Sequence, residues 1–163
     1  MQKQKGFSLI ELLIVVAIIL IIAAIAIPNL LRAKIAANEA SAVASVRTIN
    51  TAEITYANSY PTVGYAAKLA DMGGGGGAGC VSTSTNGCLL DTTLAAGTKS
   101  GYTFTAVQSG QTNGINTSYT INADPLQQDQ TGVRHFCSVE DAVIHFAQAA
   151  IAAAACNAAT VMQ

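Results

Sequence analysis

Charged residues are scarce in this chain, which has eight Lys and Arg and nine Asp and Glu among its 163 residues. Beyond residue 6, Arg32 and Lys34 form the only close pair of basic residues. A surface that binds nucleic acid usually presents a cluster of Lys and Arg. We therefore expect no direct nucleic-acid binding by this chain.

The sequence also lacks the motifs of common catalytic and metal sites. The glycine-rich run 73–79 is not followed by the Gly-Lys-Ser/Thr of a phosphate-binding loop. The four cysteines contain no C-x-x-C pair of the kind that holds zinc. His135 and His145 have no carboxylate at a motif spacing. We expect neither an enzyme nor a resident cofactor.

A long apolar run is present near the N-terminus. From Phe7 to Ile27 there are 21 residues, of which only Ser8 and Glu11 are polar. As a helix this run spans roughly 31 Å, at about 1.5 Å per residue, which is enough to cross a bilayer core. Lys3 and Lys5 upstream fit the basic bias of the cytoplasmic side. The run predicts a membrane-spanning helix.

Two simpler interpretations of this segment are open from the residues alone. Ala24-Ile25-Ala26 has the small residues of a secretory cleavage site. Ser8 and Glu11 have the spacing of a capping box, in which the glutamate caps the start of the helix. The capping box explains the spacing of Glu11. It does not explain a carboxylate inside a membrane span, where such groups are costly and usually functional.

Residues 5–32 resemble the class III signal sequence of bacterial type IV pilins and the related pseudopilins. The resemblance is carried by a basic leader ending in Gly6, followed by Phe7, Glu11, an aliphatic run to Ile27, and Pro28. It implies that a membrane-embedded prepilin peptidase cuts between Gly6 and Phe7 and methylates the new amine. It also implies that Glu11 of one subunit pairs with the Phe7 amine of a neighbour.

The helix is expected to continue beyond the membrane span, to about Asn58. Pro28 lies inside it and predicts a helix break, with the stretch Ala23 to Ile27 kinked or locally melted. After Pro28 the pattern becomes amphipathic, and one apolar stripe should face a small head; it comprises Leu31, Ile35, Ala42, Val46, Ile49, Ala52 and Tyr56. Polar residues should occupy the other faces; they are Arg32, Lys34, Asn38, Glu39, Arg47, Asn50 and Glu53.

Four segments after residue 100 have the alternation and the β-branched or aromatic content of strands; they are 101–107, 117–122, 133–137 and 142–146. Turn-forming pairs separate them, such as Ser109-Gly110 and Asn113-Gly114. An antiparallel sheet of three or four strands is therefore expected. The order of a long helix, a loop and a sheet agrees with the resemblance, so the expected fold class is α+β and type IV pilin-like, with a long N-terminal helix packed on a small antiparallel sheet.

The expected organisation divides the chain into six parts, of which the fourth, residues 59–100, is a Gly-rich connecting loop between helix and sheet. The six are a leader (1–6), a transmembrane or filament-core helix (7–28), an amphipathic helix (29–58), the loop (59–100), the sheet (101–147) and an Ala-rich tail (148–163).

Four cysteines and two aspartates are further candidates for sites. A head outside the cytoplasm can hold disulfides, and the pairs Cys80–Cys88 and Cys137–Cys156 are favoured. Pairings of Cys80 or Cys88 with Cys137 or Cys156 stay open. Calcium is the one metal considered. The major pseudopilin of type II secretion carries it in a C-terminal loop, and Asp124 and Asp129 are weak candidates for such a site.

The resemblance leaves two main functions open. The first is a structural subunit of a type IV pilus, and the second is a pseudopilin of a type II secretion system. A membrane-anchored binding protein that does not assemble is the third. The implied partners are further copies of the chain, the prepilin peptidase, an inner-membrane assembly platform and the membrane itself. The implied locations are the inner membrane for the precursor, and then an extracellular pilus or a periplasmic pseudopilus.

Overall fold

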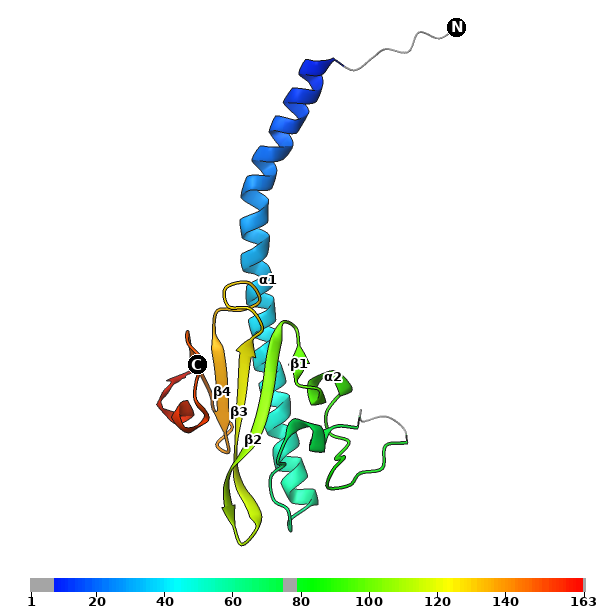
Figure 1. The fold of residues 1–163 in the computed structure, drawn as a ribbon, viewed down its shortest axis with the longest axis vertical. Coiled ribbons are helices and arrows are strands. Elements are labelled where there is room, and N and C mark those ends of the chain that lie inside the picture. Colours follow the sequence, from blue (N-terminus) through cyan, green and yellow to red (C-terminus); the bar gives the residue numbers. More distant parts are fainter. Residues whose placement is uncertain (1–7, 75–78, 163) are drawn as a thin grey trace. The chain divides into compact units, whose positions relative to one another are not determined.

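The computed structural model describes residues 8–74 and 79–162. A long helix is followed by a six-stranded antiparallel sheet whose strands lie in chain order, β1-β2-β3-β4-β5-β6 (Figure 1). The chain divides into two compact units, one ending at Lys34 and one beginning at Ile35, which we call the head. The elements are α1 (Leu9–Ser59), η1 (Leu69–Met72), α2 (Thr92–Ala95), β1 (Thr98–Lys99), β2 (Tyr102–Thr112), β3 (Ile115–Pro125), β4 (His135–Val139), β5 (Ile144–Ala147), η2 (Ala153–Ala158) and β6 (Thr160–Val161).

Helix α1 begins with a segment that is apolar on all sides. By length and composition it could cross a membrane, and none of that span is buried within the structure. The helix runs without interruption through Pro28. Of the kink or local melting expected at Ala23 to Ile27, the melting is therefore not present. Proline removes only one backbone hydrogen bond, and the intact turns on both sides maintain the helix here.

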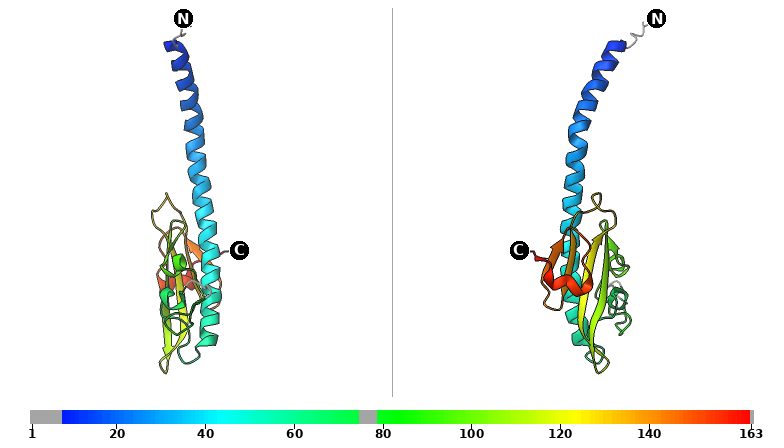
Figure 2. Two further views of the ribbon diagram at one scale, coloured as in Figure 1. Left: turned by 90° about the vertical axis from the view of Figure 1, so that its right-hand side faces the viewer. Right: turned by 60° about the vertical axis from the view of Figure 1, so that its left-hand side comes forward.

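The second half of α1 packs against one face of the sheet within the head (Figure 2). Ala42, Val46, Ile49, Ala52 and Tyr56 are all buried, as the apolar stripe predicted. They meet large side chains from the strands; the largest are Tyr102, Tyr119, Phe136 and Ile121. The N-terminal end of the stripe was predicted less well, because Leu31 is 44% exposed and Ile35 is only half-buried.

The sheet has more strands than the three or four expected. The four predicted segments correspond to β2, β3, β4 and β5, while β1 and β6 have only two residues each. Two residues are too few to show an alternating pattern, and so these edge strands could not be recognised in the sequence. The loop expected at 59–100 also contains η1, α2 and β1.

The β2–β3 hairpin is longer than expected because only one of its two predicted turns is a turn. Asn113 and Gly114 have positive φ angles of 54° and 81° and connect the strands, as a tight two-residue turn requires. Ser109-Gly110 lies inside β2 instead. The register between β2 and β3 shifts at Gly110, so this glycine marks a bulge and not a chain reversal.

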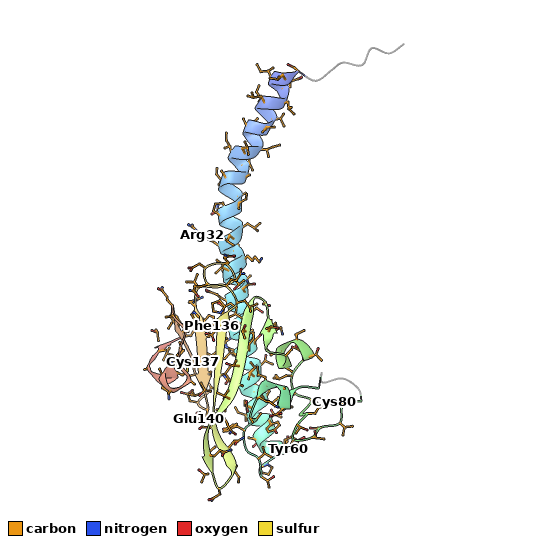
Figure 3. The ribbon with its side chains drawn as sticks, viewed as in Figure 1. Arg32, Tyr60, Cys80, Phe136, Cys137 and Glu140 are labelled. Carbon is orange, nitrogen blue, oxygen red and sulfur yellow. A yellow bond between two sulfur atoms is a disulfide. The ribbon has the colours of Figure 1, made fainter. Side chains whose placement is uncertain are left out.

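Two disulfides are present in the head, Cys80–Cys88 and Cys137–Cys156. These are the pairings favoured from the sequence. Cys80 and Cys137 lie on opposite sides of the head (Figure 3). Cys137 and Cys156 are 0% and 1% exposed and pack with Val139, so this bridge ties the tail to β4.

Loss of the Cys137–Cys156 bridge should destabilise the head more than loss of Cys80–Cys88. A disulfide contributes about 2–4 kcal/mol, and the contribution increases with the length of the enclosed loop. The sequence separations are 19 and 8 residues, and only the longer bridge lies in a buried cluster. The measurement is chemical denaturation of the two double-alanine variants. Equal losses of unfolding free energy would contradict this prediction.

Candidate functional site

Glu11 lies in the first turn of α1 and caps it. Its Oε2 accepts a hydrogen bond from the backbone N–H of Ser8 at 3.1 Å. One further contact closes the first turn, from the N–H of Leu12 to the carbonyl oxygen of Ser8 at 3.2 Å. The glutamate half of the expected capping box is therefore formed. The carboxylate is exposed, so capping does not prevent it from meeting a cation on a second molecule.

The expected cleavage site lies next to this turn. Gly6 and Phe7 both fall outside the described residues. Chemically, a cut between them would create an ammonium group at Phe7. That cation would be four residues from Glu11, about one helical turn along the chain.

The surface that follows Glu11 is apolar and uncovered. Between Leu12 and Leu31 the sequence contains no charged residue. Its large side chains are 44–71% exposed, from Leu31 at the low end to Leu30 at the high end. A helix that is apolar on every side is stable only when lipid or protein covers it. Glu11 is thus the single charged group on a long surface that must be buried in the working protein.

Glu39 is a buried carboxylate in the head, although the sequence predicted it on a polar face of the helix. Glu39 Oε1 accepts the backbone N–H groups of Val133 and Arg134 at 2.9 and 3.1 Å. Its Oε2 meets the Arg134 guanidinium at 2.7 Å. Burial alone would raise the pKa of Glu39, but these hydrogen bonds outweigh it and hold the pKa below its usual range. Arg134 also lies 5.6 Å from the ring centroids of Phe136 and Phe146.

Asn50 is a second residue that was expected to point outward and is buried. Its side chain donates to the Ser138 hydroxyl at 2.9 Å and accepts from the Tyr119 hydroxyl at 3.0 Å. These partners are 88 and 69 residues away in the sequence. The helix pattern alone could not indicate them. Glu39 and Asn50 hold α1 to β4 and to the loop before it, which places them in the framework of the head.

The two weak calcium candidates, Asp124 and Asp129, have different surroundings. Asp124 lies 2.6 Å from His135 Nδ1, a pair that the sequence spacing did not reveal. The other ring nitrogen of His135 lies 3.1 Å from the Gln128 side-chain oxygen. Asp129 has a positive φ of 63° in the loop between β3 and β4. Among residues 8–74 and 79–162, no three His, Cys, Asp or Glu side chains are grouped to hold a metal ion.

Comparison with known proteins shows which proteins the N-terminal segment resembles. A family model described as the prokaryotic N-terminal methylation motif matches residues 1–27. The type IV wide pilus major component PilA4 of Thermus thermophilus is 64% identical over 39 residues, which cover 24% of this chain and 30% of the relative. The N-terminal segment thus matches a methylation motif, and the chain is similar over a short stretch to a type IV pilus component. Its long helix and antiparallel sheet form a type IV pilin-like α+β fold.

A second relative is also named as a pilin. The type IV major pilin protein PilA of Myxococcus xanthus is 43% identical over 54 residues, which cover 33% of this chain and 24% of the relative. The chain thus spans less than a third of the length of either relative. No solved structure matches. Both names describe components of a pilus.

Proposed function

We propose that this chain is a structural subunit of a type IV pilus and that it assembles into a helical filament through α1. The observation that carries the proposal is an uncovered apolar helix with one carboxylate in its first turn. The two pilin relatives support it. In the membrane, lipid covers this helix. In a filament, the helices of neighbouring subunits cover one another.

Processing at Gly6 links these two states. We infer that the prepilin peptidase removes residues 1–6 and methylates the amine of Phe7, as the N-terminal methylation motif at residues 1–27 suggests. Cleavage changes the charge of the helix start because it removes two lysines and creates one ammonium group. The new cation is the natural partner for Glu11 of an adjacent subunit.

The energetics explain why a single charge matters for assembly. Transfer of the helix from lipid to a bundle gains little from water exclusion, because lipid is already apolar. Packing and polar pairing must therefore drive assembly. An unpaired carboxylate in such a bundle would cost several kcal/mol. Pairing of Glu11 with the neighbouring amine removes that cost and also sets the register between subunits.

The precursor belongs in the inner membrane in this proposal, with α1 as its anchor, and the assembled protein belongs in an extracellular pilus. Its partners are other copies of the chain, the prepilin peptidase and an inner-membrane assembly platform. No direct contact with nucleic acid is part of the proposed function, and Arg32 and Lys34 are too few to form a dedicated patch.

A pseudopilin of type II secretion would share the same helix and the same processing. Shear fractionation separates the two functions. Cells are sheared, and filaments and cell envelopes are probed by immunoblot, with an inner-membrane marker as the control for lysis. A pilus subunit appears in the sheared fraction without the marker. A protein that stays entirely with the cells, although it is processed, is not the subunit of an extracellular pilus.

A further inference from the structure

Glu53 is a carboxylic acid fully enclosed by the head. It lies in the second half of α1 and is 0% exposed. Its Oε2 accepts the backbone N–H of Ala66 at 2.9 Å. Within the described part of the chain, no group donates to Oε1. An ionised carboxylate away from water needs several donors, so this environment favours the neutral acid.

The groups coupled to Glu53 supply no compensating positive charge. Asp71 of η1 contributes a negative charge that disfavours ionisation of Glu53. Tyr56 of α1 and Tyr119 of β3 contribute neutral phenols. The cation beside Asp71 is Lys68, at 3.9 Å and with its side chain 69% exposed. Burial, the largest cause, and Asp71 together raise the pKa of Glu53 to about 7, although the Ala66 N–H lowers it.

The segment Val63–Ala66 joins Glu53 to the β2–β3 hairpin. Asn116 of β3 donates its backbone N–H to the Val63 carbonyl at 2.8 Å, and its side chain donates to the Tyr65 carbonyl at 2.7 Å. The N–H of Tyr65 returns a bond to the Asn116 carbonyl at 3.1 Å. A Cβ at Gly64 would lie 2.1 Å from that same carbonyl oxygen, so the close approach requires glycine.

We propose that Glu53 is a proton-dependent latch for residues 63–66. The neutral acid holds this segment between α1 and β3, and loss of its proton to solvent loosens the segment while the rest of the head stays folded. This inference goes beyond the proposed function. It concerns the surface that the head presents around this segment and the hairpin, whichever filament the chain forms.

The direction of the pH dependence follows from the raised pKa. In the loosened form the carboxyl group meets water and regains its ordinary pKa of 4.5, against about 7 when enclosed. The closed form therefore holds a proton that the open form releases between these values. Closure is fully favoured below pH 4.5 and weakens as the pH rises through 7. The opening equilibrium should increase about 40-fold between pH 5 and pH 7 and then level off.

The test is amide hydrogen exchange of the full chain in detergent from pH 5 to pH 8, corrected for intrinsic exchange rates. The reporters are the amides of Tyr65, Ala66 and Asn116, and the reference amides are those of residues 121–123 in the centre of β3. Exchange of the reporters relative to the reference should rise by about 40-fold from pH 5 to pH 7. A constant ratio across this range would overturn the proposal.

Two variants isolate the carboxyl group. Glu53→Gln keeps an oxygen for the Ala66 N–H but cannot ionise, so the reporter ratio should become independent of pH. Glu140→Gln is the matched control, because this carboxylate is exposed in the turn after β4 (Figure 3), and it should keep the wild-type profile. A wild-type profile in Glu53→Gln overturns the latch. If that variant does not fold, the reporter ratio of the unmodified chain decides the question.

Discussion

Replacement of Glu11 by alanine is expected to abolish filaments while leaving membrane insertion and cleavage intact. The apolar span and Gly6 are unchanged in this variant, so the anchor and the peptidase site remain. Assembly should fail because the Phe7 amine of a neighbour would then be buried without a counter-charge, at a cost of several kcal/mol per subunit. The measurement is the amount of protein in sheared filaments compared with the amount in whole-cell membranes.

Two further variants distinguish charge from helix capping at this position. Glu11→Gln can still accept the Ser8 N–H that caps α1, but it has no charge, and it should be nearly as defective as alanine. Glu140→Ala removes an exposed carboxylate of the head and should assemble normally. Normal filament yield from Glu11→Ala would show that Glu11 is only a cap, and the pairing mechanism would have to be abandoned.

Gly6→Val should block processing almost completely. In the pilin-type leader, the peptidase must approach the bond after Gly6, and a branched side chain beside that bond crowds it. The variant should accumulate as the longer precursor in the membrane and yield no filaments. Immunoblotting distinguishes the two forms by mobility. Gln2→Val, which places the same side chain farther from the cut, serves as the control and should be processed. Unimpaired maturation of Gly6→Val would place the cleavage elsewhere.

The features predicted well from the sequence depend on short stretches of chain. The apolar run near the N-terminus carries its information within a few turns of helix, and a methylation motif matches residues 1–27. The alternation of polar and apolar residues within each segment is also a local pattern, and it predicted β2 to β5. The two disulfides present are the pairings that the sequence favoured, although the positions of the four cysteines left the alternative pairings open.

The features predicted poorly depend on partners that are distant in the sequence. Glu39, Asn50 and Glu53 were placed on polar faces of α1, because polarity normally indicates solvent. Glu39 instead meets Arg134, which is 95 residues away. Among the residues that the structure describes, the hydrogen-bond donor to Glu53 is the backbone N–H of Ala66, and no side-chain pattern can indicate a backbone donor. The local melting expected near Pro28 is not present for the opposite reason, because a local propensity was overridden by the turns on both sides.

The central claim is that this chain is cut after Gly6 and then built into a pilus through the helix that this cut exposes. Mass spectrometry of the N-terminal peptide from sheared filaments tests it most directly. The account predicts a peptide that begins at Phe7 and carries an N-methyl group. A peptide that begins at Met1, or one produced by cleavage near Ala26, would contradict it.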